Sequence, residues 1–112
     1  MTIRKFKKLS PRQLGEMARL FRALAEPSRL ALLQSLRERP MTVNELTKSC
    51  GLLQANVSKQ LGALYQANLV VRRRCGKSVC YALRDSIVSE LCLRVCGKLL
   101  KDAKASVAAF RA

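Results

Sequence analysis

Histidine and tryptophan are missing from this sequence, acidic residues number only seven, and aromatic residues make up 4% of the chain. Without histidine, the commonest general base and the commonest metal ligand are both lost. The chain also lacks paired carboxylates, a glycine-rich phosphate loop and a nucleophile beside a base. Because these groups carry most enzymatic chemistry, we expect a protein that is not an enzyme.

Long apolar segments are absent as well. No apolar run approaches the ~18 residues that a membrane span needs, and the basic N-terminus has no apolar stretch like that of a signal peptide. We therefore expect a cytoplasmic protein without a membrane partner. In a reducing cytosol its five cysteines would be free thiols by default.

Basic residues dominate what is present. The chain has 22 Lys and Arg against 7 Asp and Glu, a formal charge of +15 in 112 residues. Such a large positive net charge implies a polyanionic partner, either nucleic acid or an anionic membrane surface. A hydrophobic content of 49% is enough for an aliphatic core, and the length suits one domain. We expect a basic arm over residues 1–9 and a single domain over 10–112.

Capping signals divide the first half of the chain into helices. Ser10 with Gln13 has capping-box spacing, as does Thr42 with Glu45. The first pair begins a helix that Pro27 closes, and a second helix spans about 27–37. The second pair begins a short helix that stops near Cys50–Gly51, and another helix follows after about three residues. We expect the second helix to turn three leucines inward: Leu30, Leu33 and Leu36.

The second half predicts a hairpin and a long helix. Residues that favour strands surround Gly76, which indicates arms near 69–74 and 79–83. Asp85 can cap a helix over about 86–110, whose apolar face comprises Val88, Leu91, Cys92, Val95, Cys96, Leu99, Ala103 and Phe110. The chain is therefore expected to be mainly α (α+β), a winged helix-turn-helix of order ααααββα. The two outer helices have broad apolar faces, so we expect them to form a homodimer interface.

The helix within residues 51–70 has two different faces. Aliphatic side chains and Tyr65 form one, whereas the other carries amide, hydroxyl and ammonium groups, which suit base edges in a major groove. A basic hairpin tip beside it suits phosphates. We expect the DNA-binding residues to be Gln54, Ala55, Asn56, Ser58, Lys59, Arg72, Arg73, Arg74 and Lys77. The competing interpretation is an ordinary surface helix with a solvated hairpin.

Two segments resemble the ArsR/SmtB family of bacterial repressors: LFRALAEPSRLALLQSL, and MTVNELTKSCGLLQANVSKQLGALYQANLVVRRRCGKSVCYAL. The resemblance covers about residues 11–96. It implies a homodimeric winged-helix repressor that leaves an operator when an inducer binds. By motif position it implies that Gln54, Ala55, Ser58 and Lys59 face the major groove. The wing over 72–77 would then reach phosphates or the minor groove.

The sequence departs from the family at its sensing positions. Leu53 stands where relatives often cap the recognition helix with Ser or Thr, and Thr47 stands at the key position of the family's arsenic site. Gln34 occupies the place of the cysteine in the persulfide-sensing branch. The zinc sites of relatives use Asp and His, and this chain has no His. None of the familiar sensing sites is intact.

Cysteines elsewhere offer candidate sensing sites. Cys92 and Cys96 lie one helical turn apart, and two thiolates at this spacing can bind As(III), Sb(III) or another soft metal ion, with a third sulfur from the partner subunit. The alternative is that both are small buried hydrophobes. Cys75 and Cys80 flank the hairpin turn and are secondary thiol candidates for a reversible disulfide, whereas Cys50 is expected to be structural.

These observations predict a DNA-binding transcriptional regulator. We expect a homodimeric repressor that binds double-stranded DNA at an inverted repeat and is released by a soft metal, a metalloid or an oxidant. One alternative is a constitutive or architectural DNA-binding protein without a sensor. A second is a basic amphipathic protein on anionic membranes, which the ordered helix-turn-helix and wing argue against.

Overall fold

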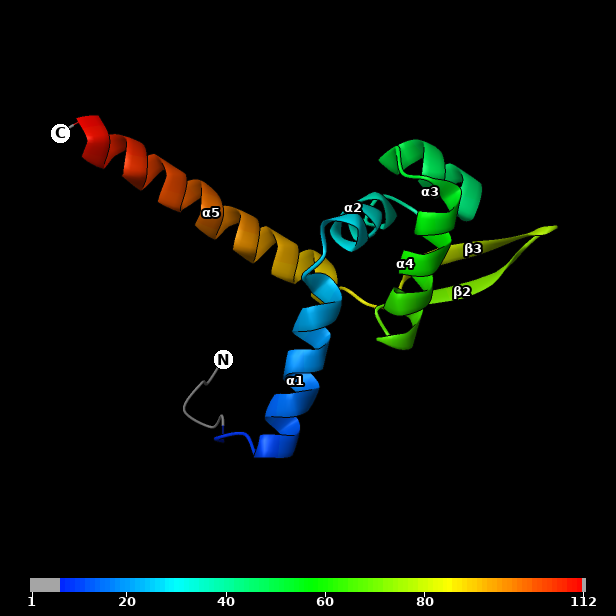
Figure 1. Cartoon of the computed structure of the whole chain (residues 1–112), viewed down its shortest axis with the longest axis horizontal. Coiled ribbons are helices and arrows are strands. Elements are labelled where there is room, and N and C mark those ends of the chain that lie inside the picture. Colours follow the sequence, from blue (N-terminus) through cyan, green and yellow to red (C-terminus); the bar gives the residue numbers. More distant parts are fainter. Residues whose placement is uncertain (1–6, 112) are drawn as a thin grey trace.

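The computed structural model describes residues 7–111, so most of the basic arm predicted over 1–9 lies outside the described residues. Four helices, a hairpin and a fifth, longer helix follow one another, as the sequence predicts (Figure 1). The elements are α1 (Pro11–Leu24), α2 (Pro27–Leu36), β1 (Met41–Thr42), α3 (Val43–Cys50), α4 (Gln54–Gln66), β2 (Val70–Cys75), β3 (Ser78–Leu83) and α5 (Ile87–Arg111).

The helix starts follow the capping signals. In α1, Ser10 accepts a hydrogen bond from the Gln13 backbone N–H at 3.2 Å, and the Gln13 side chain accepts one from the Ser10 N–H at 2.9 Å. Thr42 and Glu45 form the same reciprocal pair at α3. The bond from the Thr42 N–H also lowers the pKa of the Glu45 carboxyl. Both predicted capping boxes are therefore confirmed.

Two left-handed glycines and one aspartate set three further boundaries. Gly51 ends α3 with φ +68°, and Gly76 turns the hairpin with φ +67°, a conformation that L side chains rarely adopt. Asp85 accepts a hydrogen bond from the Ile87 backbone N–H at 3.0 Å, at the start of α5. The predicted hairpin arms and the start of the long helix agree with the structure to within one or two residues.

One core prediction is wrong. Leu30 was expected to face inward, but its side chain is 41% exposed, whereas Leu32, Leu33 and Leu36 are buried. The α2 helix carries leucines on more than one side, so spacing alone does not say which row packs inside. The packing of α3 and α4 against α2 selects the row that contains Leu32 and leaves Leu30 outside.

The core lies where α2, α3 and α4 meet the sheet. It is entirely aliphatic apart from one methionine, in agreement with the low aromatic content. Its buried members are Leu32, Leu33, Leu36, Met41, Leu46, Val57, Leu61, Leu64, Leu69, Val70 and Val88. Val88 is the one residue of α5 in this set, so α5 joins the core only through its first turns.

The sheet has three antiparallel strands in the order β1-β3-β2. The β1 strand was not predicted from the sequence; it has two residues and places Met41 opposite Tyr81 and Thr42 opposite Cys80. Its short length explains the miss, because only the pairing with distant β3 defines it as a strand. By holding the start of α3 against β3, it fixes the helix-turn-helix relative to the hairpin.

A guanidinium group joins α1, α2 and α4. Arg29 of α2 donates from Nε to the Ala23 carbonyl at 2.6 Å and from Nη2 to the Arg22 carbonyl at 3.2 Å, both in the last turn of α1. Its Nη1 donates to Oε1 of Gln60, the buried polar residue of α4, at 2.9 Å. Nothing in the local sequence pattern pointed to this junction.

The outer helices leave broad apolar surfaces open. Figure 1 shows α1 and α5 leading away from the rest of the molecule in different directions. The radius of gyration is 17.2 Å, against about 13 Å for a compact chain of this length. On α1, three large apolar side chains are 40–52% exposed: Leu14, Met17 and Phe21. Among the described residues, no helix is both long and apolar enough to cross a membrane.

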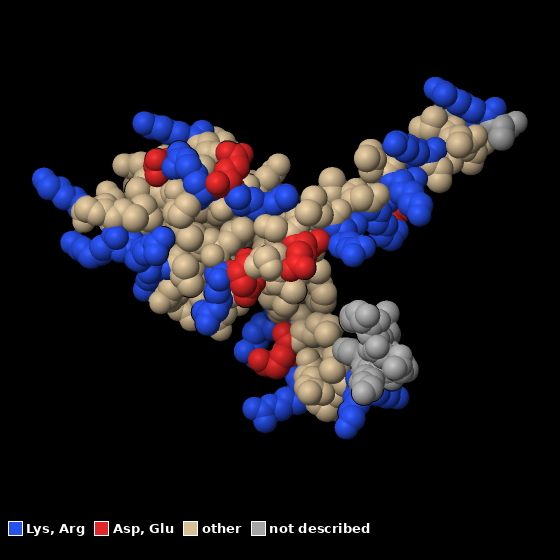
Figure 2. Space-filling model, turned by 180° about the vertical axis from the view of Figure 1, so that it is seen from behind, with Lys and Arg blue, Asp and Glu red and all other residues tan. Residues whose placement is uncertain are grey.

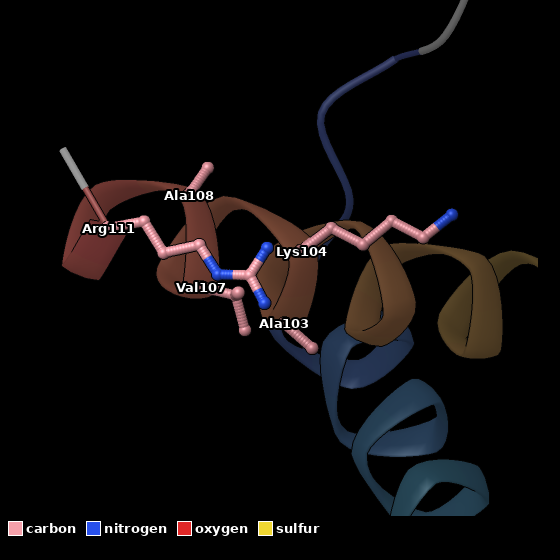
Figure 3. A pocket seen from close by; sticks show the side chains of 5 residues that line it. All are labelled: Ala103, Lys104, Val107, Ala108 and Arg111. Atoms are coloured by element: carbon pink, nitrogen blue, oxygen red, sulfur yellow. The ribbon is translucent and has the colours of Figure 1, made fainter.

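The α5 helix carries a regular apolar seam from its second turn onward. Leu93, Leu100 and Val107 recur every seven residues and are 63%, 58% and 50% exposed. Further along, Figure 3 shows a shallow hollow whose lining residues all belong to α5: Ala103, Lys104, Val107, Ala108 and Arg111. A hollow made by one helix is an open surface, and a seven-residue apolar repeat is typical of a helix that packs against another helix.

Replacing Arg29 with alanine should lower the free energy of unfolding by about 1.5–3 kcal/mol, because it removes charged hydrogen bonds to groups at two helices. Urea denaturation at a fixed protein concentration measures the change. The control is Arg19→Ala, which removes only an exposed pair with Glu16 at 3.6 Å and should cost less than about 0.5 kcal/mol. Equal losses in the two variants would contradict the role given to Arg29.

Candidate nucleic-acid interface

Helices α3 and α4 form a helix-turn-helix joined through Gly51. Val57, Leu61 and Leu64 are fully buried and anchor α4 in the core. This anchoring turns the opposite side of the helix outward, where the predicted base-reading residues lie exposed: Gln54, Ala55, Ser58 and Lys59. The structure therefore brings these four residues together on one accessible helix face.

Asn56 differs from the other predicted reading residues because it is half-buried and already hydrogen-bonded. Its Oδ1 accepts a hydrogen bond from Nε2 of Gln60 at 3.1 Å. Gln60 in turn accepts the bond from Arg29. The side-chain amide of Asn56 is thus held in one orientation, with its Nδ2 donors pointing away from Gln60. Gln60 is not among the residues predicted from the sequence, although a glutamine at an inward position of α4 indicates a buried polar contact.

The wing carries its basic residues on both faces of the hairpin. Arg72 lies over the ring of Tyr65 in α4, with 4.0 Å from Cζ to the ring centroid, a cation–π contact that fixes the wing to the recognition helix. Arg73 and Arg74 are exposed on opposite faces, and Lys77 lies in the turn. Figure 2 shows Lys and Arg side chains projecting around the wing end of the molecule.

The start of α4 has no side-chain cap. Leu53 occupies the N-cap position, makes no capping hydrogen bond, and is 81% exposed. The departure from Ser or Thr noted in the sequence therefore leaves the first backbone N–H groups of α4 without a side-chain acceptor. Free N–H groups at a helix start suit an anionic oxygen.

The five cysteines are free thiols in different surroundings. Cys50, the last residue of α3, contacts α2, with its Sγ 3.4 Å from Oγ of Ser35 and 3.6 Å from the Ala31 carbonyl oxygen, which supports the structural role expected for it. Cys92 packs against the core, whereas Cys96 is exposed on α5. Within residues 7–111, no three His, Cys, Asp or Glu side chains cluster closely enough to hold a metal ion.

The wing cysteines are close to each other but are not directly opposite. Cys75 pairs with Ser78, and Cys80 pairs with Arg73, so the two thiols are diagonal neighbours on the hairpin. Hydrogen bonding with the Cys75 thiol, followed by partial burial, raises the pKa of the Cys80 thiol. The two cysteines therefore do not face each other directly across the hairpin but are diagonal neighbours on one of its faces.

Sequence comparison identifies the family of the chain. The model of the bacterial regulatory protein arsR family matches residues 26–71. The Mycobacterium tuberculosis regulator NmtR is 42% identical over 77 residues, which are 69% of this chain and 64% of that protein, just under two thirds of its length. The uncharacterized regulator Rv0081 of the same species is 36% identical over 99 residues, 85% of this chain and 87% of that protein.

Solved structures share the whole arrangement. The crystal structure of Rv0081 has a TM-score of 0.73 at 34% identity and covers 89% of this chain and 99% of that one. The crystal structure of the antimony-specific repressor AntR has a TM-score of 0.75 at 28% identity and covers 92% of this chain and 93% of that one. The homodimeric winged helix-turn-helix domain of Mb0332 from Mycobacterium bovis has a TM-score of 0.71 at 27% identity, and the match covers 89% of this chain and 94% of that one.

A helix-turn-helix with an exposed polar face, a basic wing fixed beside it and these extended similarities agree with one another. The resemblance stated from the sequence is therefore confirmed: the chain belongs to the arsR family of bacterial regulatory proteins and is a DNA-binding regulator of transcription with a winged helix-turn-helix fold.

Proposed function

We propose that the protein is a homodimeric repressor that binds an inverted-repeat operator in double-stranded DNA and leaves it when an inducer binds at cysteine thiolates. The observation that carries this proposal is the pairing of two surfaces. The exposed polar face of α4 suits base edges in the major groove, and the basic wing fixed to it through Arg72 and Tyr65 suits the phosphates beside it. The proposed role is binding and not catalysis. The proposed location is the cytoplasm, where a bacterial regulator meets DNA.

Base reading is assigned to the amino-terminal half of α4. Gln54 and Ser58 lie one turn apart on the exposed face, so both can reach the same groove. Asn56 presents amide donors, because its Oδ1 is taken by Gln60, and such donors suit the acceptor atoms of purines and thymine. The backbone N–H groups at the start of α4 have no side-chain cap, so they can donate hydrogen bonds to a DNA phosphate beside these side chains.

Dimer formation follows from the open apolar surfaces of α1 and α5. Contiguous exposed apolar side chains of this size are rare on monomers and mark interaction sites. The Mb0332 domain, similar in fold over most of its length, is described as homodimeric. A second copy supplies matching surfaces to both helices and a second recognition helix to the DNA, which explains why the operator should be a repeat.

Cys92 and Cys96 are the proposed inducer site. They are separated by one helical turn near the base of α5, with Cys92 against the core and Cys96 outward. Two thiolates alone do not complete a metal site, so the dimer must supply a further ligand across α5. Soft ions such as As(III) and Sb(III) prefer sulfur ligands, and the similar repressor AntR is described as antimony-specific. The alternative remains a DNA-binding protein without a sensor.

The dimer should be measurable directly. At micromolar concentration, sedimentation velocity should give twice the mass of one chain, and Leu100→Asp should shift the protein towards monomer because it places a charge in the apolar seam. The matched control is Lys101→Asp, at the next residue along α5, which is exposed and lies about 100° around the helix from Leu100 and so outside the seam. Operator half-sites should be ~10 bp apart centre to centre, or a multiple of it. A monomeric wild type would contradict the proposal.

Phosphate and base contacts should respond differently to mutation. Arg73→Ala or Arg74→Ala should weaken binding to every sequence and reduce the salt slope by about 1 for each lost contact. Gln54→Ala or Ser58→Ala should instead reduce the preference for operator over random DNA by about 1–3 kcal/mol. Fluorescence anisotropy across a salt series measures both quantities, with Lys101→Ala on α5 as the charge-matched control. An unchanged preference in Gln54→Ala would show that the recognition face is misassigned.

The inducer site can be tested by a pair of double variants. Cys92→Ser with Cys96→Ser should bind operator as wild type does but resist release by arsenite or antimonyl tartrate. Cys75→Ser with Cys80→Ser should remain releasable by these metalloids. Release of both variants at the same metalloid concentration would place the site elsewhere, and the absence of release from wild type would favour the sensorless alternative.

A further inference from the structure

The wing carries a pair of thiols that the metalloid site does not use. Residues directly opposite across an antiparallel ladder share a face, as do residues two apart on one strand. Because Cys75 pairs with Ser78 and Arg73 with Cys80, both cysteines lie on one face of the hairpin, on either side of the turn at Gly76 and Lys77. Diagonal neighbours of this kind are within reach of each other's side chains, and the strong twist of a two-stranded ribbon brings diagonal pairs closer.

The two thiols are diagonal neighbours and differ in accessibility. Cys75 is exposed near the hairpin tip, whereas Cys80 is half-buried beside β1. Their hydrogen bond is the largest influence that raises the pKa of Cys80, and the nearby charges of Glu45 and Arg73 act in opposite directions on it. An exposed thiol beside a shielded one is the arrangement in which the first reacts with a dissolved reagent and the second then reacts with the first.

The remaining cysteines lack this arrangement. Cys92 and Cys96 project from adjacent turns of one helix, where a disulfide within the pair is awkward, and Cys50, the last residue of α3, contacts Ser35 of α2. Within the described part of the chain, the wing is therefore where two thiols from different backbone segments meet.

We propose that Cys75 and Cys80 form a redox-reactive dithiol that a hydroperoxide converts into an intrachain disulfide. The Cys75 sulfur attacks the peroxide, the O–O bond breaks, and a sulfenic acid forms with release of an alcohol, or of water when the oxidant is hydrogen peroxide. The Cys80 sulfur then attacks the Cys75 sulfur, and the sulfenic hydroxyl leaves with the Cys80 proton as water. Two thiols are oxidised to one disulfide, and one peroxide is reduced.

The disulfide would change the conformation of the hairpin tip, the part of the wing that carries basic side chains. A bond of ~2.05 Å between the sulfurs fixes the Cβ–S–S–Cβ torsion and draws the diagonal together. Arg74 and Lys77 flank this diagonal, so their positions relative to α4 shift when it closes. This consequence rests on the proposed DNA-binding function, and we expect oxidised protein to bind operator about fivefold more weakly or worse.

Peptide mapping tests the disulfide without DNA. Trypsin cleaves after Arg74, Lys77 and Arg84, so Cys75 and Cys80 fall in separate peptides, 75–77 and 78–84. After treatment of the reduced full-length protein with a few equivalents of hydrogen peroxide and blocking of free thiols, a non-reducing digest should contain these two peptides joined. They should separate on reduction.

Two variants assign the roles of the thiols. Cys80→Ser should accumulate a sulfenic acid on Cys75 that dimedone traps, and Cys92→Ser with Cys96→Ser should form the linked peptide as wild type does. Full alkylation of both wing cysteines after oxidation, or linkage of either to a cysteine elsewhere or in another chain, would overturn the proposal.

DNA affinity tests the consequence separately. Anisotropy should show weaker operator binding by peptide-mapped oxidised wild type and no effect of peroxide on Cys75→Ser with Cys80→Ser. Equal affinity of the reduced and disulfide forms would overturn the regulatory part, while failure of the reduced protein to bind any operator would count against the proposed function instead.

Discussion

The guanidinium group of Arg29 holds the last turn of α1, the start of α2 and the middle of the recognition helix in one relation. Its planar set of donors satisfies two α1 carbonyl oxygens and the side chain of Gln60 together. Gln60 then fixes the amide of Asn56 beside the proposed DNA-reading face of α4. An apolar contact tolerates sliding, whereas these directional bonds do not. Three consecutive hydrogen bonds therefore connect α1, the helix proposed to meet a second subunit, with Asn56 on α4, the helix proposed to read DNA. In the proposed dimer, a change in how two copies pack would reach Asn56 along these bonds.

Local chemistry made most of the fold predictable. Ser10, Thr42, Gly51 and Gly76 act on their immediate neighbours, so their effect on helix and turn boundaries is readable from spacing alone. Leu30 shows where such reasoning ends. A helix with leucines on several sides does not reveal which row its neighbours will cover, and that choice is made by α3 and α4. The β1 strand is the same kind of case, since two residues become a strand only through partners about forty positions away.

The candidate site was predictable in part for the same reason. The exposed positions of α4 follow from its buried ones by helical geometry, so the outward face could be named before the structure was known, although its contacts with bases remain predictions. The Arg29–Gln60 contact joins residues 31 positions apart and has no local pattern. The relation of Cys75 to Cys80 required the hairpin register, which a shift of one residue would have changed to opposite faces of the sheet.

The seam along α5 ties the amount of protein to its activity. A chain that leaves Leu93, Leu100 and Val107 in water can bury them only on meeting a second copy, so in the proposed dimer the stability of the fold depends on the concentration of chains. When the chain concentration is below the dissociation constant of the dimer, the dimer concentration rises with the square of the chain concentration. Operator occupancy would then respond steeply to synthesis and dilution, because a twofold fall in the concentration of chains lowers the concentration of dimers about fourfold in this regime. The affinity of the two α5 surfaces for each other would thus determine the chain concentration that repression requires.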